Sequence, residues 1–323
     1  MALNSGVPQA IGLSIIIPAR NSSRFIEECL TAIRERVPGD RSEVIVVDNG
    51  SLDDTVAKAR SHGARIVSVP SGFVSAVRNS GARAARYPML AFVDSDCAVR
   101  PGWFEAVTAA LSDPSIGVTG RRHELPDSPT WVESAWQSAH RMPMEDGPTD
   151  VAYIPAGNMA VRSEVFSSVG GFDESLETGE DPDLCARIAA SGLRVVQDAS
   201  IRCVHLGEPK TLRDVFRRER WHGRGARLRY ADGRHAPVTY ATATIGGWLI
   251  AAPAISYMVG ADAVQAAMLL VAAPVLIPVI YAVRCVGIRR PARLVRLSAV
   301  YVAYFAGRVA AFPVAMSRML GGK

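Results

Sequence analysis

The chain of 323 residues is long enough for one large domain with an appendage, or for two domains. Its net charge of +5 is unevenly distributed, because the residues through His205 carry −7 and those from Leu206 onward carry +12. Basic residues among apolar runs favour anionic membrane lipids as partners over nucleic acid, for which there is no binding motif. The five cysteines include no close pair, which excludes a zinc knuckle and indicates reduced thiols in a cytosolic compartment. The first ten residues lack a charged start followed by an apolar core, so we expect no cleavable signal peptide.

The N-terminal part of the chain alternates short apolar runs with amphipathic stretches. Each apolar run stops at a polar or proline residue, which predicts a buried strand, and the stretches between the runs have helical spacing. Such short alternating units predict an α/β fold with a mostly parallel sheet flanked by helices, in which ligands lie beyond the carboxyl ends of the strands. The expected strands are residues 13–18, 44–47, 64–69 and 89–93, and the expected helices are residues 22–36, 55–60 and 75–86.

Asp94, Ser95 and Asp96 directly follow the fourth of these strands. Two carboxylates that lie two positions apart at the mouth of a strand can point the same way. Their hard oxygen atoms suit Mg²⁺ or Mn²⁺, which proteins typically hold with one or two carboxylates together with water and substrate phosphates. The alternative is that they cap the next helix, whose start is marked by Pro101.

Other polar segments end the first two strands. Pro18, Arg20 and Asn21 follow the first strand and Asp48 follows the second, so we expect them on the same rim as the two aspartates. A separate acidic cluster at residues 180–183 surrounds Pro182 at the start of a helix. Read without further context, that cluster is an acidic helix cap.

This part of the chain contains six short motifs. They are Pro18-Ala-Arg-Asn21, Val46-Val-Asp-Asn-Gly-Ser-Leu-Asp-Asp-Thr55, Arg78-Asn-Ser-Gly81, Asp94-Ser-Asp96, Gly170-Gly-Phe-Asp-Glu174 and Gly179-Glu-Asp-Pro-Asp-Leu184. Together they resemble the family 2 glycosyltransferases of the GT-A fold, in order and in spacing, over roughly residues 12 to 225. The resemblance implies an inverting sugar transfer from a nucleotide-diphosphate sugar, with a metal ion bridging the diphosphate.

The resemblance also implies the catalytic residues. An acceptor hydroxyl must lose its proton as it attacks the anomeric carbon, and Asp181 would take that proton as the general base. Glu180 would orient the base or contact the acceptor. Asp94 and Asp96 would serve the metal and the sugar nucleotide, with Ser95 between them.

For the nucleotide, the resemblance implies that Asp48 contacts the base or ribose and that residues 18–21 shape the pocket. The sequence departs from the family at two positions, because Arg20 stands where an aromatic residue is frequent and Asn49 where a second aspartate is frequent. The identity of the base is therefore less well defined than the fold. Arg20 either stacks on a base or is a solvated surface arginine.

Three further residues are candidates. Arg78 and Asn79 lie on the helix before the metal motif, where they would reach ribose or phosphate oxygens unless they are simply structural. His205 ends a later apolar run and is either an additional metal ligand or a structural histidine.

Residues 123–150, which are irregular in pattern and rich in proline, form either an acceptor-facing flap or a packed surface excursion.

A basic amphipathic helix is expected at residues 212–230, where seven arginines alternate with apolar anchors suited to an anionic leaflet. Its Arg217-Arg-Glu-Arg-Trp221 resembles the Q-x-x-R-W signature of processive family members, with arginine in place of glutamine. Because that signature borders the acceptor site, the resemblance implies that Arg220 and Trp221 contact the acceptor or the diphosphate.

The C-terminal part predicts membrane helices. Residues 239–260 and 263–283 each have the length of about 20 mostly uncharged residues that spans a bilayer, and Gly260-Ala-Asp262 joins them into a hairpin. Arginines flank both ends of the hairpin, which places the catalytic domain on the cytoplasmic side. A third apolar segment, residues 297–316, carries Arg308 within it and is either a span or an amphipathic interfacial helix. Of the two we expect a span.

We therefore expect a catalytic domain at residues 1–210, a basic interfacial segment at 211–236 and a membrane region of two or three helices at 237–323. The main hypothesis is a membrane-anchored glycosyltransferase that moves a sugar from a nucleotide-diphosphate donor to a lipid-linked or cell-envelope saccharide. The alternatives are a processive polysaccharide synthase subunit and a catalytically silent nucleotide-sugar-binding scaffold. The presence of both acidic motifs argues against the scaffold.

Overall fold

The computed structural model describes residues 12–139, 147–223 and 236–320. Its tertiary contacts divide the chain into two compact units. The first comprises the residues up to Pro126 together with Pro143–Gly207, and the second comprises Asp127–Met142 together with the residues from Glu208 onward. The segment 127–142 therefore interrupts the first unit in sequence but folds with the C-terminal helices.

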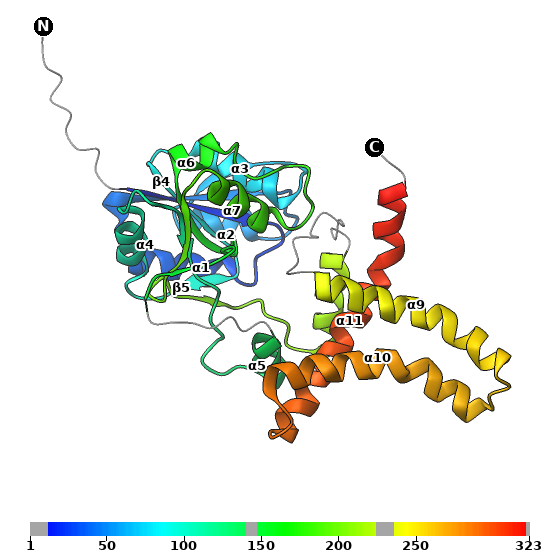
Figure 1. The fold of residues 1–323 in the computed structure, drawn as a ribbon. Coiled ribbons are helices and arrows are strands. Elements are labelled where there is room, and N and C mark those ends of the chain that lie inside the picture. The colour runs from blue at the N-terminus through cyan, green and yellow to red at the C-terminus, as the bar shows by residue number, and fades with distance from the viewer. Residues whose placement is uncertain (1–11, 140–146, 224–235, 321–323) are drawn as a thin grey trace, which may run out of the picture. The chain divides into compact units, whose positions relative to one another are not determined.

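The first unit is an α/β fold of alternating strands and helices (Figure 1). Its strands are β1 (Leu13–Ala19), β2 (Ser42–Asp48), β3 (Arg65–Ser68), β4 (Met89–Val93), β5 (Cys97–Val99), β6 (Ile116–Gly120), β7 (Thr149–Asp150), β8 (Asn158–Arg162), β9 (Arg194–Gln197) and β10 (Cys203–His205). Its helices are α1 (Ile26–Arg36), the short 3₁₀ helix η1 (Gly39–Arg41), α2 (Thr55–Ser61), α3 (Val74–Ala84), α4 (Trp103–Leu111), α6 (Ser163–Ser168) and α7 (Glu180–Ala190).

Eight strands form one sheet in the order β3-β2-β1-β4-β8-β6-β9-β7. The pairs β2–β3, β1–β2, β1–β4 and β6–β9 are parallel, whereas β8 is antiparallel to both of its neighbours and β7 is antiparallel to β9. The predicted mostly parallel α/β sheet is confirmed, with an antiparallel strand at its centre that the sequence pattern did not reveal. β5 and β10 pair separately in a two-stranded antiparallel sheet.

The two faces of the large sheet bury separate apolar cores. Along β1, Ile15 and Ile17 face one core and Ile16 faces the other, which is the period of two that a strand imposes on its side chains. The first core is covered by α1 and α4 and the second by α3, α6 and α7. Because both faces are covered, the edge at the carboxyl ends of the strands is where polar side chains gather.

The second unit is helical. It contains α5 (Trp131–Ala139), α8 (Leu212–His222), α9 (Ala236–Met258), α10 (Ala263–Val286) and α11 (Pro291–Leu320). Of the residues predicted to form the basic helix, 224–230 lie outside the part of the chain that the structure describes. α5 and β7 show that the region 123–150, expected to be irregular, contains regular elements on both sides of residues 140–146.

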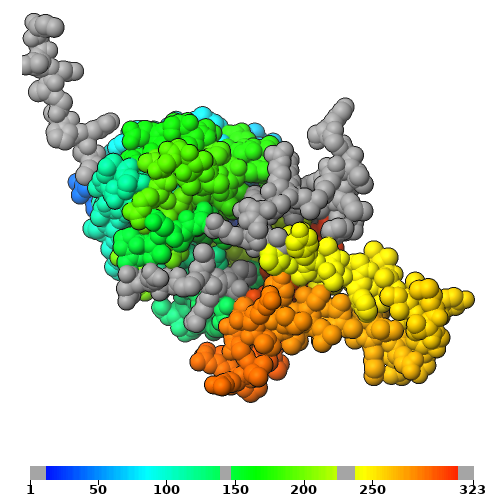
Figure 2. Space-filling view, viewed as in Figure 1, coloured from blue at the N-terminus to red at the C-terminus, as the bar shows by residue number. Residues whose placement is uncertain are grey.

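Helices α9, α10 and α11 are each long and apolar enough to cross a membrane. α9 and α10 form the predicted hairpin, and Figure 2 shows the two helices packed side by side (yellow and orange). The indole nitrogen of Trp248 in α9 donates a hydrogen bond to the carbonyl oxygen of Leu269 in α10 at 2.6 Å. At the start of α10, Asp262 and Gln265 form a capping box that satisfies the first free N–H groups.

Candidate active site

The parallel strands β1, β2 and β4 bring their carboxyl ends to one rim. The strand register places Asp48, the last residue of β2, opposite Ala19 of β1. β4 lies on the other side of β1 and ends at Val93, so the turn that begins with Asp94 opens on the same rim. The three sequence segments expected to share an edge do so because parallel strands end together.

Asp96 meets His205 beside this rim. β10 pairs antiparallel with β5 so that His205 lies opposite Cys97, and the Nε2 atom of His205 is 3.3 Å from Oδ1 of Asp96. Ligand atoms of Asp96, Cys97 and His205 all lie within 4.8 Å of one another. Burial raises the pKa of the Cys97 thiol, which keeps it protonated and makes the carboxylate and the imidazole the better ligands.

The surroundings of these ligands fit a small divalent cation. A Cβ atom at Gly207 would overlap the carboxylate of Asp96, and one at Gly157 would lie 2.5 Å from Oδ2 of Asp94. Glycine at both positions therefore leaves room around the carboxylates. Oxygen and imidazole ligands with open space beside them suit Mn²⁺ or Mg²⁺, with the remaining positions left for water and phosphate oxygens.

Arg78 links the metal motif to the acidic helix α7. Its guanidinium donates to Oδ1 of Asp94 at 2.7 Å and to Oε1 of Glu180 at 2.6 Å. The Arg78 side chain is only 5% exposed, and the guanidinium carbon also lies 5.7 Å from the centre of the Phe172 ring. One buried cation thus fixes carboxylates from positions 94 and 180 relative to each other, in a planar fork geometry that lysine lacks.

Asp181 stands in the first turn of α7, next to Glu180. The helix begins after Gly179, whose φ of 85° lies in the left-handed region that glycine adopts without strain. Burial and the adjacent Glu180 charge raise the pKa of Asp181 to about 7, against the opposing effect of Arg78. A carboxyl group that titrates near neutral pH is suited to accept a proton.

Asn79, the neighbour of Arg78, is buried and bonded within the protein. Its amide nitrogen donates to the carbonyl oxygen of Phe172 and to the carboxylate of Glu174, and its amide oxygen accepts from the backbone N–H of Phe172. These contacts hold the Gly170–Glu174 segment that leads into α7. Asn79 therefore supports the segment that leads into α7, in line with the structural alternative that the sequence left open. Its contact with substrate oxygens stays a prediction.

The residues expected to bind the nucleotide lie in the loops that follow β1 and β2. Asn21 has a φ of 51°, and its side-chain oxygen accepts from the N–H of Leu52 at 2.8 Å. The Asp48 carboxylate accepts from the N–H of Ser51 at 3.0 Å and is otherwise largely buried. The first bond joins the loop after β1 to the loop after β2, and the second stabilises the loop after β2.

Pro18, Arg20 and Ser95 complete the expected set on this rim. Pro18 is half-buried near the end of β1, and Arg20 is exposed. The hydroxyl group of Ser95 donates to the hydroxyl group of Ser22 at 2.8 Å, which connects the metal motif to the loop after β1. Arg220 and Trp221 belong to α8 in the second unit, so their predicted contact with substrate stays a prediction.

His123 is a residue near the site that the sequence gave no reason to select. Its ring lies 5.0 Å from that of His205, and a Cβ atom at Gly157 would contact both His123 and Asp94. A lone histidine after a strand carries no distinguishing signal, because its proximity to the metal motif depends on how β6, β8 and β10 are arranged.

Comparison with known proteins identifies the family to which this fold belongs. The profile of glycosyl transferase family 2 matches residues 14–170. An uncharacterised glycosyltransferase of Mycobacterium bovis is 32% identical over 196 residues, which cover 57% of this chain and 82% of that protein. The chain belongs to glycosyl transferase family 2.

Other relatives are more distant or longer. The pre-mycofactocin glycosyltransferase of Mycobacterium tuberculosis is 28% identical over 257 residues, which cover 75% of this chain but only 53% of that protein, so the chain matches about half of its length. The mannosyltransferase PcManGT of Pyrobaculum calidifontis, solved with GDP-Man and Mn²⁺, has a TM-score of 0.60 at 19% sequence identity. The match covers 92% of this chain and 86% of the PcManGT chain. TarS 1–349 of S. aureus, solved with UDP-GlcNAc, has a TM-score of 0.50 at 16% sequence identity, and the match covers 96% of this chain and 92% of the TarS chain. These two structures support the GT-A-type fold.

Proposed function

We propose that the chain is an inverting, metal-dependent glycosyltransferase that moves a sugar from a nucleotide-diphosphate sugar to a lipid-linked or cell-envelope saccharide. The observation that carries this proposal is the double contact of Arg78, because one buried guanidinium holds both the metal motif and the acidic helix. A group that binds diphosphate and a group that accepts a proton then flank one reaction centre.

In the proposed reaction a carboxylate oxygen of Asp181 accepts the proton of the acceptor hydroxyl. The hydroxyl oxygen forms a bond to the anomeric carbon, and the bond from that carbon to the diphosphate breaks on the opposite face, with its electron pair leaving on the diphosphate. Attack opposite the leaving group inverts the configuration. A pKa of about 7 makes Asp181 a stronger base than an ordinary carboxylate while leaving much of it ionised at neutral pH.

Around this centre the other residues bind and orient. Asp96 and His205, with Asp94 beside them, would hold Mg²⁺ or Mn²⁺, which when bound neutralises charge on the diphosphate. Arg78 and Glu180 position the base relative to these ligands. The Mn²⁺ named with the GDP-Man complex of the structural neighbour supports the choice of metal.

The donor is assigned by class only. The structural neighbours were solved with GDP-Man and with UDP-GlcNAc, which supports a nucleotide-diphosphate sugar and does not distinguish the base. We assign its nucleotide part to the rim formed by residues 18–21, Asp48 and Ser95.

The C-terminal helices support a membrane-proximal acceptor. α9 and α10 form an apolar hairpin. The exposed Arg284 lies in the last turn of α10, and the exposed Arg289 and Arg290 follow that helix. Positive charge at this end favours the cytoplasmic side, where nucleotide sugars are made available to the catalytic unit. On α8 of the second unit, Arg220 and Trp221 are both exposed and are assigned to acceptor or diphosphate contact.

The test is nucleoside diphosphate release by the detergent-solubilised protein with a panel of UDP-, GDP- and dTDP-sugars, each with Mg²⁺, Mn²⁺ or EDTA. Membrane-lipid extract supplies the acceptor. We expect metal-dependent release from one donor, lost in Asp96→Ala and Asp181→Asn. Asp183→Asn is the matched control, because Asp183 lies on the same helix and its carboxylate is already paired with Arg187.

The product of the active donor is then examined by NMR for its anomeric configuration, and retention would refute the inverting mechanism. Release that is insensitive to EDTA would refute the metal requirement. If no donor turns over in any condition, the scaffold alternative replaces the enzyme, and the roles given to Asp96 and Asp181 are withdrawn.

A further inference from the structure

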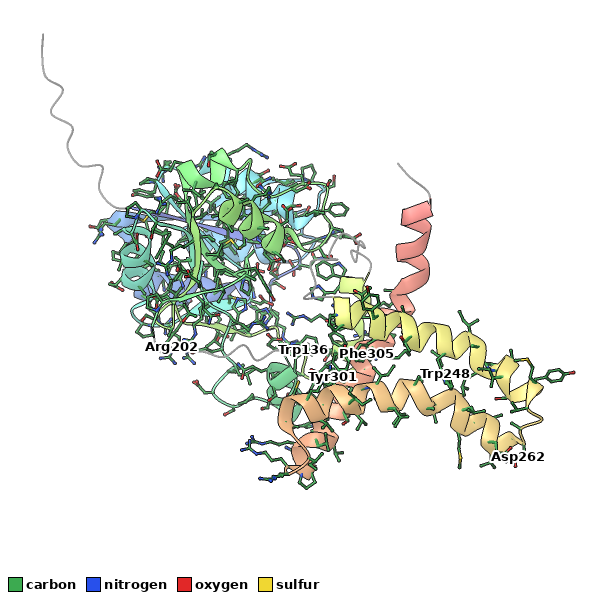
Figure 3. All side chains as sticks on the ribbon, viewed as in Figure 1. Trp136, Arg202, Trp248, Asp262, Tyr301 and Phe305 are labelled. Atoms are coloured by element: carbon green, nitrogen blue, oxygen red, sulfur yellow. The ribbon has the colours of Figure 1, made fainter. Side chains whose placement is uncertain are left out.

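Helix α11 meets the α9–α10 hairpin at its base and not along its length. The residues of α9 and α10 that pack against α11 come from the start of α9 and the end of α10, whereas the tip lies at residues 260–262. Figure 1 shows α11 (orange to red) passing crosswise at this base. In Figure 3, Tyr301 and Phe305 lie at the base and Asp262 lies at the opposite end of the hairpin. The shared apolar cluster includes Ala241, Ile245, Ala282, Leu297, Val300, Tyr301 and Phe305.

Beyond this base, the C-terminal half of α11 packs closely against α8. A Cβ atom at Gly307 of α11 would lie only 2.5 Å from the carbonyl oxygen of Phe216 in α8. Where α8 ends, a Cβ atom at Gly223 would lie 2.7 Å from the Cβ atom of Ala311. The two helices therefore touch backbone to backbone through small residues.

Charged and aromatic contacts reinforce this packing. Nε of Arg308 is 2.7 Å from Oε2 of Glu219, whose side chain is 3% exposed, and a carboxylate so buried is costly unless it is paired. The Arg308 guanidinium also lies 5.0 Å from the centre of the Tyr304 ring. The same Tyr304 ring is 6.1 Å from Trp136 of α5. α5 and α8 thus both lie against residues 304–311 of α11.

The chain connectivity fixes the side of the membrane on which α5 and α8 lie. The segment 127–142 leaves the first unit and returns to it, and 16 residues are too few to cross about 30 Å of hydrocarbon twice. α8 begins at Leu212, five positions after the first unit ends at Gly207. A gap of that length extends about 18 Å at most, and α8 exposes Arg213, Arg217 and Arg220, which are costly in hydrocarbon. α5 and α8 are therefore on the side of the first unit.

Pro291 and Ala311 of α11 must then both be on that same side. Its start at Pro291 follows the base of the hairpin, and Tyr304, Arg308 and Ala311 lie against α5 and α8. From Pro291 to Ala311 a helix extends about 30 Å, so a spanning α11 would place Ala311 on the opposite face of the membrane.

The free face of α11 has the composition of a surface that contacts a membrane interface. Val295 is 69% exposed and Val302 is 41% exposed, and Ala306 and Ala310 continue the same stripe. At and just before its N-terminal end, four exposed residues are basic, namely Arg289, Arg290, Arg293 and Arg296. Apolar residues flanked by arginines suit the boundary between headgroups and acyl chains in an anionic leaflet.

We propose that α11 lies in the plane of the membrane interface on the side of the catalytic unit, with its free face in an anionic leaflet. Its other face carries α5, α8 and the base of the hairpin, and the Glu219–Arg308 pair fixes α8 to it. The chain then crosses the membrane twice, through α9 and α10. This arrangement is independent of the proposed catalytic function.

The test is the side from which single cysteines react with a membrane-impermeant maleimide in sealed vesicles of known orientation. Cys285 is the exposed native cysteine and is replaced in a Cys285→Ser background, while the other four are buried. Ala310→Cys probes α11, Glu105→Cys marks the first unit and Ala263→Cys marks the tip of the hairpin, all at exposed positions.

We expect Ala310→Cys to react from the same side as Glu105→Cys and Ala263→Cys to react from the other side. Reaction of Ala310→Cys from the side of Ala263→Cys would overturn the proposal. If lipid shields Ala310→Cys from both sides, a protease-cleavable tag after Lys323 decides, because cleavage from the side of Glu105→Cys supports an in-plane α11 and cleavage from the other side refutes it.

Discussion

Replacing Asp181 by asparagine should abolish turnover and yet stabilise the fold at alkaline pH. Burial and the Glu180 charge raise the pKa of Asp181 from 3.8 to about 7. Between these two values the folded protein holds a proton that the unfolded chain has released, so stability falls as the pH rises through this window.

The magnitude follows from the size of the shift. One pKa unit corresponds to about 1.4 kcal/mol, so a shift of this size costs roughly 4 kcal/mol once Asp181 is ionised in the folded protein. Partial access to solvent reduces this cost, and we expect Asp181→Asn to raise the free energy of unfolding by about 1 to 3 kcal/mol at pH 8. At pH 4 the gain should largely disappear, because the aspartic acid is then protonated in the folded protein.

Two assays follow the variant. Thermal unfolding in detergent at pH 8, 6 and 4 gives the stability gain, and nucleoside diphosphate release gives the activity, which we expect to fall by about 10² to 10⁴-fold. In the unmodified protein the turnover should rise with pH through about 7, as the base loses its proton. Asp183→Asn serves as control and should keep most of the turnover, with no stability gain at pH 8.

Two results would refute the reasoning. A stability gain of the same size at pH 4 and at pH 8 would show that the ionisation of Asp181 is not its source. Turnover by Asp181→Asn above about a tenth of the normal value would show that another group accepts the proton.

Four further substitutions test other parts of the structure. Arg78→Lys keeps the charge but not the forked contact with two carboxylates, so it should cost about 2 to 4 kcal/mol in thermal unfolding and lower turnover as well. Gly207→Ala crowds the nearest metal-site carboxylate and should weaken Mn²⁺ binding about 10 to 100-fold in a metal titration. Glu219→Arg and Arg308→Glu should each destabilise the protein in detergent, and the double exchange should restore part of the loss.

Each of these has a matched comparison. Arg83→Lys changes an exposed arginine on the same helix as Arg78 and should alter stability by less than about 0.5 kcal/mol. Gly39→Ala adds a methyl group in open space and should leave metal affinity unchanged. Equal effects in a variant and its control would contradict the structural explanation, and additive losses in the double exchange would show that Glu219 and Arg308 are not coupled.

Much of the fold can be predicted from the sequence because its signals are local. The strands β1, β2 and β4 follow from β-branched and apolar runs with sharp polar ends, and the hairpin of α9 and α10 from two long uncharged segments joined by a short turn. Parallel strands end on one edge, so the strand pattern by itself places Asp48 and Asp94 on a common rim.

The side-chain contacts within the candidate site depend on long-range packing that the local sequence does not reveal. That Arg78 bridges Asp94 and Glu180 depends on residues 16 and 102 positions away, and no local pattern distinguishes such an arginine from a solvated one. The approach of His205 to Asp96 likewise requires β10 to pair with β5.

In the C-terminal helices, too, the sequence and the tertiary structure determine different properties. Composition by itself determined that three C-terminal segments are apolar enough to span a bilayer. Composition cannot tell a span from a helix that is covered on one side by protein, because both bury apolar residues. Only the tertiary structure decided that α11 packs against α5, α8 and the base of the hairpin. Its ion pair with α8, for example, joins residues 89 positions apart.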